Sequence, residues 1–167
     1  MTNKITFFVP GLPVPAGSKK AFPIFRGKGR SEFVRCNVVD DSGARGVQWR
    51  SDIKRIAAEA KSIDAPLWDF PIEAHFSFHF SRPLSHWGTG RNRSKLKPSA
   101  PRFMVSTPDL LKVARAVEDA LSGVIYTDDR QIVRETLEKA YADGNDIPGV
   151  WIDLKESAFI YCVPEGE

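Results

Sequence analysis

Residues 107–123 read TPDLLKVARAVEDALSG, and residues 124–131 continue as VIYTDDRQ. From about residue 110 to residue 122, apolar residues recur at the spacing of one helix face. These residues are Val113, Ala116, Val117, Ala120 and Leu121. Gly123 suits the position just beyond a helix end. The stretch therefore predicts one amphipathic helix, whose polar side carries Lys112, Arg115, Glu118 and Asp119.

Carboxylates stand at both ends of this helix. Asp109 precedes it, and Asp128 and Asp129 follow it. A helix of about 12 residues is about 18 Å long, and the six residues 124–129 cover about 20 Å when extended. We therefore expect the chain to return along the helix and bring Asp109 and Asp129 within reach of one divalent cation. Mg²⁺, or Mn²⁺ in its place, prefers such oxygen ligands and activates water against a phosphodiester.

Each acid also has a structural alternative. Asp109 occupies a position where helix-capping residues are common, and Asp128 with Asp129 could form a turn. Asp119 lies four residues after Arg115, which favours a surface ion pair between them. Spacing alone leaves these alternatives open.

Outward from this region the chain alternates between strand and helix patterns. Strand patterns cover 4–9, 72–81, 131–140, 150–154 and 159–163, with a short one at 38–39, and a second helix is expected over 46–62. In the 72–81 strand, Phe76, Phe78 and Phe80 point to one face. His75 and His79 share the other face about 13 Å apart, too far to chelate one ion. We expect one α+β domain over 1–167, in two layers, with a mixed β-sheet packed by two main helices.

The charge is unevenly distributed. The net charge is +3, yet residues 17–35 hold six basic residues against Glu32, and residues 82–108 hold six basic residues and no acid. We expect two basic loops, at about 15–36 and 82–107, that bind a polyanion. The candidate DNA-binding residues are Lys19, Lys20, Arg26, Arg82, His86, Trp87, Arg91, Arg93, Lys95, Lys97 and Lys112.

The composition is that of an ordinary globular protein, with 42% hydrophobic and 27% charged residues. The sequence has no apolar run near 18 residues and no apparent signal peptide, which argues against membrane insertion or secretion. Cys36 and Cys162 are isolated, so reduced thiols and a cytoplasmic location are expected.

Several motifs resemble those of the RusA family of Holliday junction resolvases, which are frequent in phages and prophages. The resemblance rests on Pro108-Asp109-Leu110, Arg115-Ala116-Val117, Asp119-Ala120-Leu121, Gly123, Tyr126, Asp128-Asp129 and Gln131-Ile132-Val133. The segments 82–101 and 9–18 resemble the phage branch of that family.

The resemblance implies a homodimeric, magnesium-dependent endodeoxyribonuclease that binds four-way DNA junctions and cuts them symmetrically, in a bacterial or phage-infected cell. By position, Asp109 and Asp129 match its acidic metal ligands, and Asp128 matches the adjacent acid. Arg115 falls where the family has a functional lysine or arginine. The implied catalytic residues are Asp109, Asp129 and Arg115, and the implied metal ligands are Asp109, Asp129 and Asp128.

One position departs from this pattern. The family motif reads Asp-Leu-Asp, whereas Leu111 occupies the second acidic position here. An isobutyl group removes a ligand oxygen and its negative charge. Another acid such as Asp128 or Glu135 could compensate, cleavage could have been lost while DNA binding remained, or the change could be engineered.

Three functions follow from these patterns. The first is a divalent-metal endonuclease for branched DNA, with recombination, repair or phage DNA processing as its context. The second is a catalytically inactive junction-binding or protein-interaction module, which Leu111 favours. The third is a single-strand-binding protein that uses Trp87 and Phe103 as stacking platforms.

Overall fold

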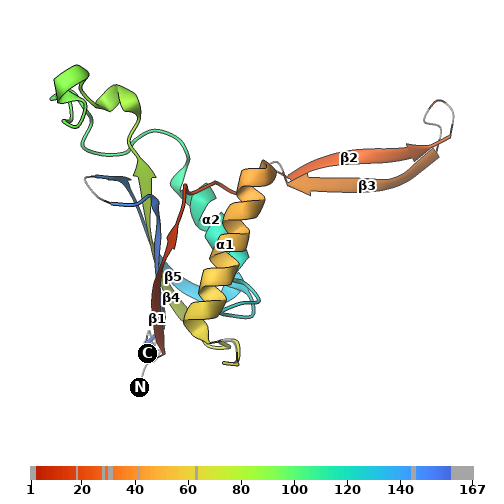
Figure 1. Ribbon diagram of the computed structural model, residues 1–167. Coiled ribbons are helices and arrows are strands. Elements are labelled where there is room, and N and C mark those ends of the chain that lie inside the picture. The colour runs from red at the N-terminus through yellow and green to blue at the C-terminus, as the bar shows by residue number, and fades with distance from the viewer. Residues whose placement is uncertain are drawn as a thin grey trace, which may run out of the picture.

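The computed structural model describes residues 3–17, 19–27, 29, 32–40, 42–62, 64–143 and 146–158. A four-stranded mixed sheet carries two helices, and a separate two-stranded ribbon projects from them (Figure 1). The helices are α1 (Gly43–Lys61) and α2 (Leu110–Leu121). The expected α+β class with a mixed sheet is confirmed.

The main sheet has the order β1-β6-β4-β5. Its strands are β1 (Lys4–Pro10), β4 (Ile72–Ser81), β5 (Ile132–Ala142) and β6 (Gly149–Glu156). β6 pairs antiparallel with both β1 and β4, whereas β4 and β5 run parallel. Parallel neighbours need a long crossover, and here the crossover contains α2.

The core lies between the helices and one face of this sheet. In β4, Ile72, Ala74, Phe76, Phe78 and Phe80 are buried, while the residues between them are partly or fully exposed. Trp49, Ile53 and Ala57 of α1 enter the same core, as does the apolar face predicted for α2. The expected alternation of β4 and the face of α2 are therefore confirmed, and they fix which side of α2 stays exposed.

The largest difference from expectation lies in the segment at about 15–36, which was predicted to be a basic loop. That prediction is wrong, because most of the segment forms β2 (Lys19–Arg26) and the start of β3 (Glu32–Asp40), paired antiparallel. Pro23 lacks a backbone donor, and it is tolerated because both strands of a two-stranded ribbon are edges. The strand pattern at 38–39 is the end of β3.

The second basic segment, 82–107, connects β4 to α2 without a long element of its own. It contains two short 3₁₀ helices, Leu84–His86 and Gly90–Asn92. We call residues 82–107 the flap. Its backbone closes on itself, since Gly88 N donates to Lys95 O and Lys97 N donates to His86 O. The strand expected over 159–163 lies outside the described residues.

Candidate active site and nucleic-acid surfaces

Asp109 stands immediately before α2, in extended backbone at the N-cap position. Its side chain makes no capping hydrogen bond to the helix. Instead the carboxylate pairs with Lys112 Nζ at 3.3 Å, and both side chains are exposed. Asp109 therefore has the position of a cap without its usual interaction, and its oxygens remain accessible to solvent.

Neighbouring segments hold the start of α2 in place. Lys139 Nζ on β5 donates to Ser106 O at 2.8 Å and to Pro108 O at 3.0 Å, which ties the approach to Asp109 onto the sheet. Ala16 N donates to Lys112 O on the other side. A cavity of about 610 Å³ opens beside Asp109 and Lys112. Its apolar wall includes Pro13, Phe80, Met104, Pro108 and Tyr141.

The residues that follow α2 return to its side. A 3₁₀ turn, η3 (Asp129–Gln131), packs against α2. The Asp128 carboxylate caps this turn by accepting from Arg130 N, and Gln131 Oε1 accepts from Asp128 N. Gln131 Nε2 donates to the carbonyls of Trp68 and Phe70. The turn interpretation of Asp128 is therefore confirmed, and its contacts fix the backbone that carries exposed Asp129.

Three carboxylates approach one another at this point. Glu118 on α2 lies beside Glu135 on β5, close enough for a hydrogen bond if one of them carries a proton. Burial, the Glu135 carboxyl and the charges of Asp129 and Asp119 raise the pKa of Glu118 to about 8. Glu135 Oε1 is buried and, when both groups are ionised, has no hydrogen-bond partner. We call Glu118, Asp129 and Glu135 the acidic cluster.

Tyr126 lies next to this cluster. Its ring is fully buried, and its hydroxyl donates to the Glu118 backbone carbonyl at 3.2 Å. Burial and the charges of Glu118, Asp129 and Glu135 raise the pKa of the phenol above its ordinary value. Tyr126 therefore stays neutral and fixes the last turns of α2 against the returning chain.

The sequence-predicted acids do not all meet in this arrangement. The charge of Asp129 acts on Glu118, whereas Asp109 pairs with Lys112. Nine residues of helix separate Asp109 from Glu118, a rise of about 13 Å. Within the described ranges, no three His, Cys, Asp or Glu side chains are arranged as they would be around a metal ion. An ion shared by Asp109 and Asp129 stays a prediction.

Leu111, Arg115 and Glu118 share one face of α2, because their positions follow i, i+4 and i+7. Leu111 is 72% exposed, although it is apolar. Arg115 is exposed as well, and the ion pair predicted with Asp119 does not form in this described part of the chain. This face thus presents a free guanidinium between a leucine and the acidic cluster. The sequence pattern identifies Glu135 as a possible compensating acid but does not identify Glu118 as a site residue. The i+7 spacing between Leu111 and Glu118 was the signal that could have identified it.

The flap is anchored by one of its own basic residues. Arg82 forms a two-point ion pair with Asp143, donates to Pro101 O, and stacks on the Tyr141 ring at 4.2 Å. Its side chain is 4% exposed. Arg82 therefore positions the flap on the end of the sheet rather than lying free on its surface.

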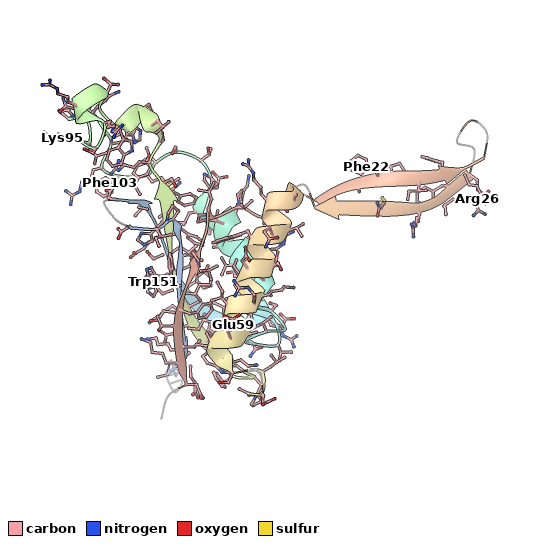
Figure 2. All side chains as sticks on the ribbon, in the orientation of Figure 1. Phe22, Arg26, Glu59, Lys95, Phe103 and Trp151 are labelled. Atoms are coloured by element: carbon pink, nitrogen blue, oxygen red, sulfur yellow. The ribbon has the colours of Figure 1, made fainter. Side chains whose placement is uncertain are left out.

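Other flap residues face solvent. Arg91, Arg93, Lys95 and Lys97 are exposed, and Lys97 Nζ donates to Ser85 O. His86 and Trp87 are partly buried, and His86 packs edge-on against Tyr141. On the ribbon, Arg26 is exposed near the turn (Figure 2). Lys19 and Lys20 lie on β2, and their side chains are outside the described set.

Within the described residues, no helix is both long and apolar enough to cross a membrane.

A comparison with curated proteins found no match. Residues 25–155 match the family described as endodeoxyribonuclease RusA, and that match includes α2, the acidic cluster, the flap and most of the ribbon. Because this match covers most of the chain and agrees with the motif around α2, the chain belongs to the RusA endodeoxyribonuclease family.

Proposed function

We propose that this protein is a divalent-metal-dependent endodeoxyribonuclease that binds and cuts branched DNA, four-way junctions in particular. The observation that carries the proposal is the acidic cluster beside Arg115 in a chain that belongs to a family of endodeoxyribonucleases. The exposed basic residues of the flap and ribbon supply what DNA phosphates need, since they attract a polyanion without reading its sequence.

The side chains of the acidic cluster suit a divalent cation. Glu135 Oε1 is a buried oxygen without a partner, and Glu118 brings a second carboxylate against it. Two anionic groups in contact repel each other, and a cation between them removes that repulsion. Mg²⁺ is commonly held by one or two carboxylates together with phosphate oxygens of the substrate. The residues therefore fit Mg²⁺, with Mn²⁺ as a substitute.

We assign Glu118 and Glu135 as the carboxylates in contact that would hold this ion, with Asp129 and Asp109 as the further acids that the family motif implies. When bound, a divalent ion supplies charge stabilisation at the phosphodiester and a more acidic water. Glu118 lies on the same face of α2 as Leu111 but about two turns further along, so this ion would be held without an acid at position 111. Asp128 is a positioning residue, since its carboxylate already caps η3.

The remaining groups act on the substrate directly. Arg115 is exposed and forms no ion pair with any residue that the structure describes, so its guanidinium is available to bind a phosphate and offset the charge that develops on it. Exposed flap residues such as Arg93 and Lys95 would hold the backbones of the DNA arms. Two copies of the chain, as the family resemblance implies, would present two clusters to one junction.

The direct test uses an end-labelled four-way junction and the full chain with Mg²⁺. Paired cuts near the branch, abolished by chelation and by Asp129→Asn, are expected. A linear duplex of the same sequence should be cut far less. No cutting of the junction at any Mg²⁺ or Mn²⁺ concentration would overturn the nuclease assignment.

Leu111 favours one other candidate, a junction-binding protein without cleavage. This candidate expects salt-sensitive junction binding, no cuts by the unaltered chain, and cuts by Leu111→Asp. Cleavage by the unaltered chain would exclude it.

A further inference from the structure

The β2–β3 ribbon extends away from the rest of the molecule (Figure 1). In the described part of the chain its strands pair with each other and not with the four-stranded sheet. A two-stranded hairpin on its own is marginally stable in water. Phe22, Phe25, Phe33 and Val34 are 40–59% exposed on it. The lack of pairing with the main sheet and the exposed apolar side chains together indicate that the ribbon contacts another molecule.

The charge of the ribbon indicates the class of that molecule. Residues 19–40 carry six basic side chains and two acidic side chains, and two of the basic residues, Lys28 and Arg30, fall between the strands in sequence. A second copy of this chain that paired through the same ribbon would bring the same positive charge against it. A polyanion complements it, and a two-stranded ribbon has a width that the DNA major groove admits.

A pair of aromatic side chains lies at the far end of the ribbon. Phe25 and Phe33 are opposite each other across the strands, next to the last pair before the turn, Arg26 and Glu32. Their ring centroids are 6.0 Å apart in an edge-to-face arrangement. Because directly opposed residues point to the same face, the two rings form one apolar surface next to the Arg26–Glu32 pair.

Apolar side chains of this kind bind DNA by stacking on bases or by entering a base step. In an intact duplex that contact requires unstacking, which costs free energy. A branch point interrupts the continuous duplex, so a base pair there has fewer constraints than one inside a duplex and exposing its face costs less free energy. The ring pair therefore distinguishes a branch from a continuous duplex, whereas the basic residues bind both.

We propose that the β2–β3 ribbon reads the branch point of the DNA, with the Phe25–Phe33 ring pair packed on unstacked bases and the surrounding basic side chains on the adjacent phosphates. This inference rests on the proposed function, because it takes branched DNA as the substrate. It adds a selectivity element that is separate from the acidic cluster.

The test compares binding of a four-way junction and a linear duplex, each with 2-aminopurine replacing one adenine, at the branch or at the matching duplex position. The variants are Phe25→Ala with Phe33→Ala, and Phe22→Ala as the matched control. Phe22 is 53% exposed on the same strand and alternates to the other face of the ribbon. None of the three residues belongs to the buried core, so the body should keep its melting temperature.

The unaltered chain should prefer the junction and change the 2-aminopurine fluorescence at its branch. The double variant should lose about tenfold in junction affinity, keep its duplex affinity and abolish that change. Phe22→Ala should behave as the unaltered chain does.

Unchanged junction affinity and fluorescence in the double variant, while the unaltered chain binds and cuts the junction, would overturn the inference alone. Loss of self-association in the double variant, with junction selectivity retained, would overturn it in favour of a second copy of the chain. Failure of the unaltered chain to bind or cut a junction would instead overturn the proposed function.

Discussion

Glu118 on α2 and Glu135 on β5 bring two carboxyl groups into contact in a partly buried site. α2 belongs to the crossover between β4 and β5, so the pair links this crossover to the strand at its end, β5. Such a contact between like charges is unfavourable without a proton or a cation. In the proposed function, this pair supplies carboxylates to the metal ion in the absence of an acid at position 111.

Glu118→Gln should weaken metal binding, because it removes an anionic ligand while keeping the shape of the side chain. We expect the affinity for Mn²⁺, measured by isothermal titration calorimetry without DNA, to fall at least tenfold. Asp119→Asn is the matched control, since it removes a neighbouring charge outside the cluster. Equal losses in the two variants would show a general charge effect and contradict the ligand assignment.

Leu111→Asp should increase Mg²⁺-dependent cleavage of a four-way junction by tenfold or more. The substitution adds a ligand oxygen and a negative charge on the face that carries Arg115 and Glu118. Leu111 is 72% exposed, so the change leaves no core cavity. Leu111→Asn supplies the control of similar size without charge. A variant that cuts no faster than the unaltered chain would mean that position 111 lies away from the reacting phosphate.

The flap should contribute to DNA affinity mainly through phosphate contacts. Replacing Arg91, Arg93 and Lys95 by Ala should reduce the slope of log K against log salt concentration by up to about 3, because each contact contributes about 0.9. Fluorescence anisotropy between about 50 and 200 mM salt measures the slope. Lys54→Ala, on the exposed side of α1, should leave the slope unchanged. A lower affinity at an unaltered slope would contradict phosphate binding by these residues.

Stability should depend on pH through the Arg82–Asp143 pair. The Arg82 guanidinium lowers the pKa of Asp143 below its ordinary 3.8. The stabilisation is therefore complete above the ordinary value and is lost as the pH falls through the lowered one. Asp143 is half exposed, so Asp143→Asn should lower the free energy of unfolding by about 1 kcal/mol at pH 7.

Urea denaturation at pH 7 and pH 3 checks this prediction. The difference between Asp143→Asn and the unaltered chain should shrink at the lower pH, since protonated Asp143 no longer pairs with Arg82. A difference that is as large at pH 3 would assign the effect to packing of the side chain instead of its charge.

Local periodicity was enough to predict the main helices and sheet. Two patterns indicate which side of an element is buried. These are the alternation of Phe76, Phe78 and Phe80 and the apolar spacing in α2. The ribbon was missed because glycine, proline and basic residues between 15 and 36 suggested a loop. The strand signal of Phe22, Ile24, Phe33 and Val34 was present, but it lacked a buried face.

The acidic cluster depends on information that local patterns do not contain. Glu118 and Glu135 meet because β5 pairs in parallel with β4 and α2 packs over it. The register of that packing is set by tertiary contacts. Residue spacing alone predicts Asp109 and Asp129 as a pair, because spacing measures how far the chain can reach, and that pairing stays a prediction.

The order of strands in the main sheet also bears on how the chain is made. β6 lies between β1 and β4, and Pro10 pairs with Gly149. A ribosome therefore releases β1 and β4 long before the strand that joins them. Until then both strands expose unpaired backbone edges, which are templates for aggregation. Because the joining contacts span most of the chain, folding should be slow, and recovery from cells should improve at low temperature or with extra chaperone.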